Sequence, residues 1–152
     1  MITAGLLTAV YSMLTSLIRV WGGGVSDKIG GARTGVLALT VMLIGALVMT
    51  FSHAYLLSLI GEIVMAFGMG VANAAVFKLV PQAVPEAVGG ATGWVGGLGA
   101  FGGFVIPPLL GLFVQHYGGS GYALGFLIFI ILSVAALTIL RSFGKTACTA
   151  GT

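Results

Sequence analysis

Long apolar runs separated by short polar connections make up most of this chain. A membrane-spanning helix needs roughly 20 consecutive apolar residues. Five stretches meet that length, namely residues 3–22, 34–52, 55–79, 88–114 and 120–141. Because the connections are short, consecutive helices should run antiparallel and pack as neighbours. The pattern predicts an all-α integral membrane protein with about five transmembrane helices.

The composition indicates a protein surrounded by lipid, and it argues against a soluble domain and against a nucleic-acid-binding protein. Of the 152 residues, 59% are hydrophobic and only 6% are charged, whereas soluble domains carry roughly 25% charged residues. Such a chain cannot cover a core with polar surface. The formal charge of +3 does not indicate nucleic-acid binding, because the basic residues form no stripe or patch.

The basic residues occur at alternate connections. Lys28 and Arg33 fall in the first, Lys78 precedes the third, and Arg141 and Lys145 lie near the C-terminus. The connection near residue 53 and that at residues 115–121 contain no Lys or Arg. Lys and Arg favour the cytoplasmic side of a membrane. We therefore expect segments 23–33 and 79–87 and the C-terminus to be cytoplasmic, in a multi-pass protein of the cell inner membrane.

On this topology, residues 1–143 form a partial transmembrane bundle and residues 144–152 form a short cytoplasmic tail. The N-terminus would lie outside. An odd number of helices and an outside N-terminus indicate a piece of a longer chain.

The most specific local pattern is RVWGGGVSDKIGGAR, residues 19–33. We predict that the first helix ends at its glycines and that Gly23, Asp27, Lys28, Gly30 and Arg33 form a tight loop, with Gly30 and Gly31 allowing a sharp reversal. One interpretation is a generic loop whose charges set topology. However, the segment resembles the conserved cytoplasmic loop of the major facilitator superfamily, found after the second and eighth of twelve helices. Four helices follow it here, so the resemblance implies helices eight to twelve of a twelve-helix fold.

A second motif, GWVGGLGAFGGFVIP at residues 93–107, resembles the glycine-rich nitrate signature of the nitrate/nitrite porter family. The segment VANAAVFKLVPQ, residues 71–82, resembles the tenth helix of the same family. The chain is therefore identified by resemblance as a C-terminal fragment of a nitrate/nitrite porter.

The glycines of this motif share faces of the fourth helix. Gly93 with Gly97, and Gly99 with Gly103, are four residues apart and lie one above the other. A face of small residues lets another helix approach closely, or lets a planar anion lie against the backbone. The spacing of the glycines alone does not decide between these two roles. The resemblance implies a substrate-lining helix that slides against its pseudo-symmetric counterpart during alternating access.

Arg19 is the leading candidate for substrate binding. It falls within a predicted helix, where a guanidinium is costly unless it faces the bundle interior or a cavity. Its planar fork suits a trigonal oxyanion. Thr8, Ser12 and Thr15 share its polar stripe. The alternative is a side chain that reaches the cytoplasmic lipid phosphates. The resemblance implies a nitrate ligand that pairs with a helix-two arginine absent from this chain.

Two further polar residues fall on the third helix. Asn73 is suited either to donating to a bound anion or to tying helices together. Glu62 lies three turns earlier on nearly the same face and invites a proton-coupling hypothesis. For Glu62 we favour a structural role as a neutral or partner-bonded carboxyl, so that Glu62→Gln leaves transport nearly normal.

The sequence thus predicts secondary active transport of nitrate or nitrite by alternating access, as part of a longer porter. Alternatives are a carrier for another small anion or a drug, or a truncated, non-transporting bundle. The three acids Asp27, Glu62 and Glu86 lie on different elements, so no catalytic constellation is expected. His53 and His116 fall in different connections, so neither metal nor cofactor is expected. The expected partners are nitrate and nitrite, the lipid bilayer and the missing N-terminal half of the transporter, without nucleic acid.

Overall fold

A computed structural model describes residues 2–52 and 54–149, and describes the side chains of residues 6, 9–52 and 54–142. His53 and residues 150–152 fall outside this part, as do the side chains of Thr8 and Lys145. The elements in chain order are α1 (Ile2–Ile29), α2 (Gly31–Phe51), α3 (Tyr55–Ala83), η1 (Pro85–Ala87), α4 (Val88–Tyr117), η2 (Gly118–Ser120), α5 (Gly121–Gly125) and α6 (Leu127–Thr149). The described residues contain helices and turns but no strand, which confirms the all-α prediction.

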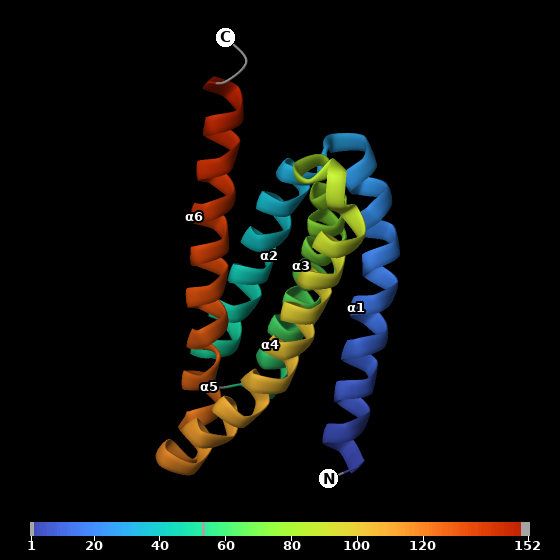
Figure 1. Cartoon of the computed structure of the whole chain (residues 1–152). Coiled ribbons are helices and arrows are strands. Elements are labelled where there is room, and N and C mark those ends of the chain that lie inside the picture. The colour runs from blue at the N-terminus through green and yellow to red at the C-terminus, as the bar shows by residue number, and fades with distance from the viewer. Residues whose placement is uncertain (1, 53, 150–152) are drawn as a thin grey trace.

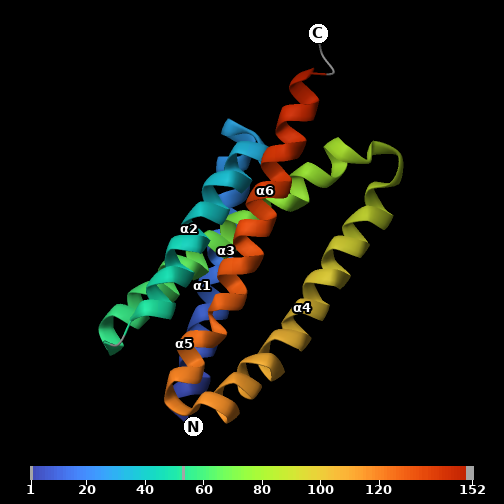
Figure 2. The same cartoon turned by 90° about the vertical axis from the view of Figure 1, so that its left-hand side faces the viewer.

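Four long helices run side by side and α4 stands apart from them. α2 packs on α3 and on α6, and α1 packs on α3 (Figures 1 and 2). Figure 2 shows α4 joined to the rest at its two ends, through the turn after α3 and through α5. Within the described residues α4 contacts α3, α5 and the two short helices η1 and η2, but not α1.

Glycines set the most extensive helix contact, between α2 and α3. A Cβ added at Gly45 of α2 would lie 2.6 Å from the Met65 backbone nitrogen, and one added at Gly68 of α3 would lie 2.5 Å from that of Met42. Small residues let helix backbones approach in this way where lipid supplies no hydrophobic drive for association. The buried cluster of Met42, Ala46 and Met65 lies at this contact.

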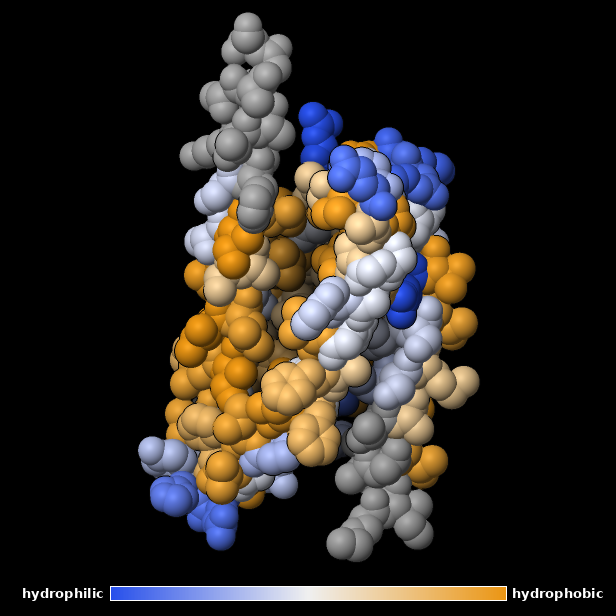
Figure 3. Space-filling view, viewed as in Figure 1, coloured by the Kyte–Doolittle hydropathy of each residue, from blue (hydrophilic) through white to orange (hydrophobic). Residues whose placement is uncertain are grey.

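The outer surface of the bundle is apolar between two polar ends. In Figure 3 hydrophobic side chains cover the middle of the molecule, and hydrophilic side chains gather at the two ends. Large residues such as Leu17, Val20 and Phe104 are more than two-thirds exposed. Three helical stretches of the described chain are long and apolar enough to cross a membrane: Gly31–Phe51, Tyr55–Ala83 and Pro85–Ser142, the last containing α4 and most of α6. The fold is that of a membrane protein.

The prediction that the first helix ends in glycines near residue 22, followed by a loop at 23–33, is wrong. α1 continues to Ile29, so Gly23, Asp27 and Lys28 are helical. Glycines do not end a helix where no water competes for the backbone groups, and Lys28 in the last turn suits the helix dipole. The reversal occurs at Gly30 alone, with φ 89°, while Gly31 already begins α2.

Other helix ends also extend beyond their predicted positions. α3 continues through Pro81 to Ala83, and α4 continues through Pro107 and Pro108 to Tyr117. Each proline removes one backbone bond without stopping the helix. Residues 144–149, predicted as a tail, continue α6 to Thr149. The predicted fifth helix is divided at Phe126 into α5 and α6.

Candidate functional site

The seam between α1 and α3 is built on two glycines. A Cβ added at Gly70 would lie 2.7 Å from the carbonyl oxygen of Thr15, and one added at Gly22 would lie 2.9 Å from the Cα of Val71. The two backbones therefore meet closely at both places. The glycine that was expected to end the first helix, Gly22, is instead a packing position.

Arg19 lies on this seam and contacts α3. Its guanidinium carbon is 4.8 Å from the centroid of the Phe77 ring, within the range of a cation–π interaction. Arg19 precedes the end of α1 by ten residues, roughly 15 Å along a helix. The side chain is exposed, so the Phe77 ring holds it on one side while its donors stay accessible on the other.

Asn73 belongs to the same face of α3 as Phe77. The two residues are four apart in one helix, so they lie one above the other. Asn73 is exposed, and within the described residues its amide takes part in no hydrogen bond. The amide therefore does not tie helices together in this part of the chain. Arg19 and Asn73 are thus brought to one seam, with Phe77 as their common neighbour.

Sequence reasoning missed Phe77. A signal was present, because an aromatic residue four positions after an intramembrane amide shares its face. The sequence does not show how far α3 is rotated about its axis. In the structure this rotation turns the face of Phe77 toward Arg19.

The candidate glycines of α4 face open space. A Cβ added at Gly93, Gly97, Gly99 or Gly103 would meet no atom within 4 Å. Within the described residues, then, no helix packs against these positions. The structure does not bring them to Arg19, because α1 and α4 make no contact.

A shallow, open groove follows one side of this helix. It has a volume of about 510 Å³ and is lined by Gly90, Gly93, Trp94, Gly97, Leu98 and Phe101. Gly93 and Gly97 therefore share a face, as their spacing predicted. The indole of Trp94 is 74% exposed and borders the groove.

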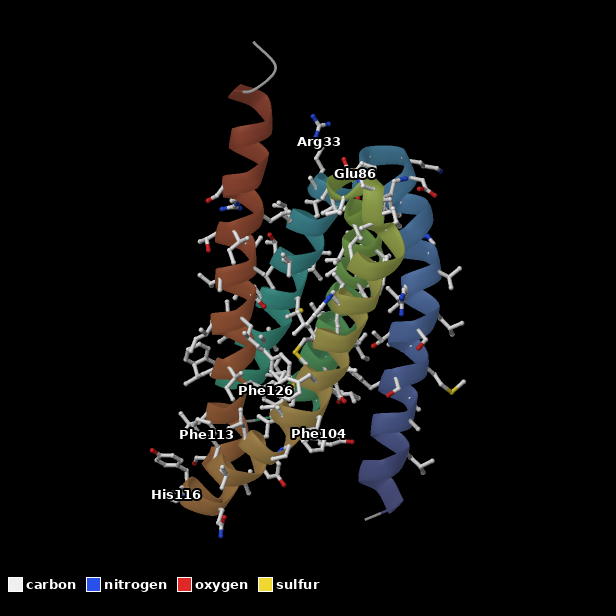
Figure 4. All side chains as sticks on the ribbon, viewed as in Figure 1. Arg33, Glu86, Phe104, Phe113, His116 and Phe126 are labelled. Carbon is white, nitrogen blue, oxygen red and sulfur yellow. The ribbon has the colours of Figure 1, made fainter. Side chains whose placement is uncertain are left out.

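The basic end of the bundle contains the residues that were predicted to form a tight loop, which we assigned to the conserved loop that moves during transport. Asp27, in the last turn of α1, forms an ion pair with Lys78 near the end of α3. The two partners are 68% and 30% exposed, respectively, so water screens the pair. Arg33 points away from the start of α2 at this same end, where Glu86 also lies, and His116 lies at the opposite end (Figure 4). Gly23 has open space around it.

Comparison with known proteins gives one family and a consistent set of relatives. The profile of the Major Facilitator Superfamily matches residues 1–146. A probable nitrate transporter, NarT, of Staphylococcus epidermidis is 30% identical over 140 residues, which is 92% of this chain and 36% of that protein. The protein of the same name in Staphylococcus aureus is 31% identical over the same shares. The chain thus spans about a third of the length of these relatives. No solved structure matches it.

Proposed function

The chain belongs to the major facilitator superfamily, and we propose that it forms the C-terminal part of a porter that carries nitrate or nitrite across the cytoplasmic membrane. In this proposal the chain corresponds to helices eight to twelve, and the anion is exposed alternately to the two sides as two halves of the transporter rock about a central site. The remainder of the porter supplies the other half of that site.

The observation that carries the proposal is the position of Arg19. A guanidinium within a membrane-spanning helix is costly unless it serves a cavity or a partner. Here the Phe77 ring stabilises the cation 4.8 Å away, and within the described residues no carboxylate neutralises it. A fixed cation with free donors attracts a small anion. Its planar fork can give two parallel hydrogen bonds to a trigonal oxyanion.

Asn73 and α4 complete the proposed site. Asn73 shares the α3 face of Phe77 and has an unused amide, so it is suited to orienting the anion. The open faces at Gly93, Gly97, Gly99 and Gly103 leave room for the anion path and for close approach of the remaining half of the porter. Both relatives are named as probable nitrate transporters, which supports nitrate as the substrate.

The basic end of the bundle supports an orientation. The end of α1, the beginning of α2 and the ends of α3 and α6 meet at one end (Figure 1). This end carries Lys28, Arg33, Lys78 and Arg141. By the distribution of Lys and Arg across membranes, we assign it to the cytoplasm, together with the C-terminus.

Arg19→Lys tests the proposal in a full-length transporter that contains this segment. Lys keeps the charge but lacks the bidentate fork. The loss of one charge-assisted hydrogen bond, worth about 1.5–3 kcal/mol, lowers nitrate uptake roughly tenfold or more in proteoliposomes. Arg141→Lys is the matched control, since Arg141 is exposed on α6 and belongs to neither the proposed site nor the predicted loop, and it should leave uptake unchanged.

Two measurements separate binding from folding and from substrate choice. The amount of each variant in the membrane, measured by quantitative blotting, should not change. Competition by nitrite, chloride and sulfate against labelled nitrate then defines the anion class. Uptake by Arg19→Lys within twofold of the parent would remove Arg19 from the site, and preference for another anion would contradict the proposed substrate.

A further inference from the structure

A second polar side chain lies on the face of α1 that carries Arg19. Ser12 precedes Arg19 by seven residues, which is about two turns and roughly 10 Å along one face of a helix. Ser12 is exposed, as Arg19 is. Because α1 begins at the end of the bundle opposite the basic end (Figure 1), Ser12 lies on the outer side of Arg19 in the proposed orientation.

The hydroxyl of Ser12 takes part in no hydrogen bond within the described residues. A serine hydroxyl in a helix can donate to the carbonyl oxygen four residues earlier, but that of Ser12 does not. A polar group in an apolar surrounding is costly when it has no partner. The proton of this hydroxyl is therefore available to an acceptor that reaches the open face of α1.

The two hydroxyls between Ser12 and Arg19 differ from it in this respect. Thr15 donates to the carbonyl oxygen of Tyr11 at 2.9 Å, and Ser16 donates to the carbonyl oxygen of Ser12 at 2.8 Å. A hydroxyl has one proton to donate, so these two present only acceptor lone pairs to their surroundings. On α1, Ser12 and Arg19 are thus separate donors with no free side-chain donor between them.

Ser26 is the other hydroxyl of α1 without a partner among the described residues, and it lies seven residues beyond Arg19. Ser26 is fully buried, so an anion on the open face of the helix does not reach it. Exposure and a free proton occur together at Ser12.

We propose that Ser12 is a second anion-binding residue, which holds the oxyanion on the outer side of Arg19 before Arg19 binds it. This assignment rests on the proposed function. A hydroxyl that donates to an anion makes a charge-assisted hydrogen bond, which is stronger than a neutral one. Arg19 adds a full charge and two parallel donors, so the anion is held more firmly at Arg19 and moves inward. The ligand is a small, singly charged oxyanion at both positions.

A structural role for Ser12 makes a different prediction. Its hydroxyl would then donate to an acceptor in the remainder of the porter and hold two helices together. In that case Ser12→Ala lowers the amount or the stability of the protein in the membrane, while the KM for nitrate stays the same.

Nitrate uptake by a full-length transporter in proteoliposomes separates the two roles. Ser12→Ala should raise the KM for nitrate about tenfold, which corresponds to about 1.4 kcal/mol and is close to the value of one hydrogen bond to a charged group. Ser16→Ala is the matched control. It makes the same substitution at an exposed position one turn away, but removes a hydroxyl that is already bonded to the backbone, so the KM should stay within twofold of the parent.

Thiol labelling forms a second arm that does not depend on transport. Ser12→Cys and Met13→Cys are compared in a transporter whose other cysteines are replaced, with a charged, impermeant thiol reagent added from outside. Met13 is 67% exposed but belongs to the apolar side of α1, where lipid excludes the reagent. Ser12→Cys should react readily, and excess nitrate should slow its reaction, whereas Met13→Cys should react little.

An unchanged KM in Ser12→Ala would overturn the inference, and so would a thiol at position 12 that reacts as little as that of Met13→Cys or that no small anion protects. If the parent carries no nitrate, the proposed function fails. Protection of Ser12→Cys by nitrite or chloride, or by neither, then still decides whether Ser12 lies on an anion path.

Discussion

Gly68→Ala places a methyl group where α3 touches the backbone of α2. The added Cβ would lie 2.5 Å from the backbone nitrogen and 2.8 Å from the Cα of Met42, and 2.8 Å from the carbonyl oxygen of Ala38. Ordinary contact begins at 3.4 Å, so the helices must separate by about 0.9 Å at this point. Because the neighbouring atoms are backbone, no side-chain rotation can relieve the overlap.

Gly97→Ala is the matched control for the size of the effect. It makes the same substitution inside a helix, but a Cβ at Gly97 meets no atom within 4 Å. Helix propensity favours alanine by about 1 kcal/mol at both positions and cancels in the comparison. What remains is the cost of overpacking at Gly68, about 1–3 kcal/mol. This corresponds to roughly five- to 150-fold in the unfolding equilibrium constant, since about 1.4 kcal/mol is tenfold.

Tryptophan fluorescence provides the assay. Trp21 contacts Phe67 with ring centroids 5.6 Å apart, next to Gly68, so its emission reports the separation of α1 from α3. The other tryptophan, Trp94, is 74% exposed and can be replaced by Phe in all variants. Unfolding is followed in micelles as the fraction of denaturing detergent rises. Equal stability of Gly68→Ala and Gly97→Ala would refute the assignment of Gly68 to packing and of Gly97 to open space.

Three further predictions follow from single contacts. Phe77→Leu removes the ring beneath Arg19 and should raise the KM for nitrate several-fold in the full-length transporter without reducing its amount in the membrane; an unchanged KM would mean that the ring does not position Arg19. Gly30→Ala forces a side chain into φ 89° and ψ 146°, a region that glycine alone adopts readily, and should destabilise the chain by about 1–3 kcal/mol in the micelle assay, whereas Gly23→Ala should not. A double-mutant cycle with Asp27→Asn and Lys78→Gln should give a coupling of about 0.2–1 kcal/mol that weakens with salt; a larger, salt-independent coupling would contradict the exposure of the pair.

The helices were predictable because the length of an apolar run is a direct physical requirement of the bilayer. Their ends were not. Gly22 looked like a stop signal, yet it is the position at which α1 touches Val71. Pro81 looked like the start of a loop, yet α3 continues through it. Glycine and proline stop helices largely through competition with water and through backbone entropy, and both effects are weaker where neighbouring helices supply the contacts.

The sequence was enough to select the candidate residues of the site, but not to predict which of them contact one another. The cost of a charge in lipid was enough to select Arg19. The pairing of Arg19 with Phe77, and of Tyr11 with Met69, depends on how far each helix is rotated about its axis. Rotation is set by the packing glycines Gly22 and Gly70, which the sequence does not distinguish from those of α4.

The single-residue connection at Gly30 also bears on how the chain enters the membrane during synthesis. α1 is not among the three stretches of the described chain that qualify as spans on their own, and α2 is. Arg19 penalises the partitioning of α1 by as much as about 2.5–3.5 kcal/mol, the cost of a charge at the centre of a helix. With one residue between them, the two segments reach the insertion machinery together. The strongly apolar α2 therefore carries α1 into the bilayer as a helical hairpin, and the biogenesis of the arginine-bearing helix depends on its successor.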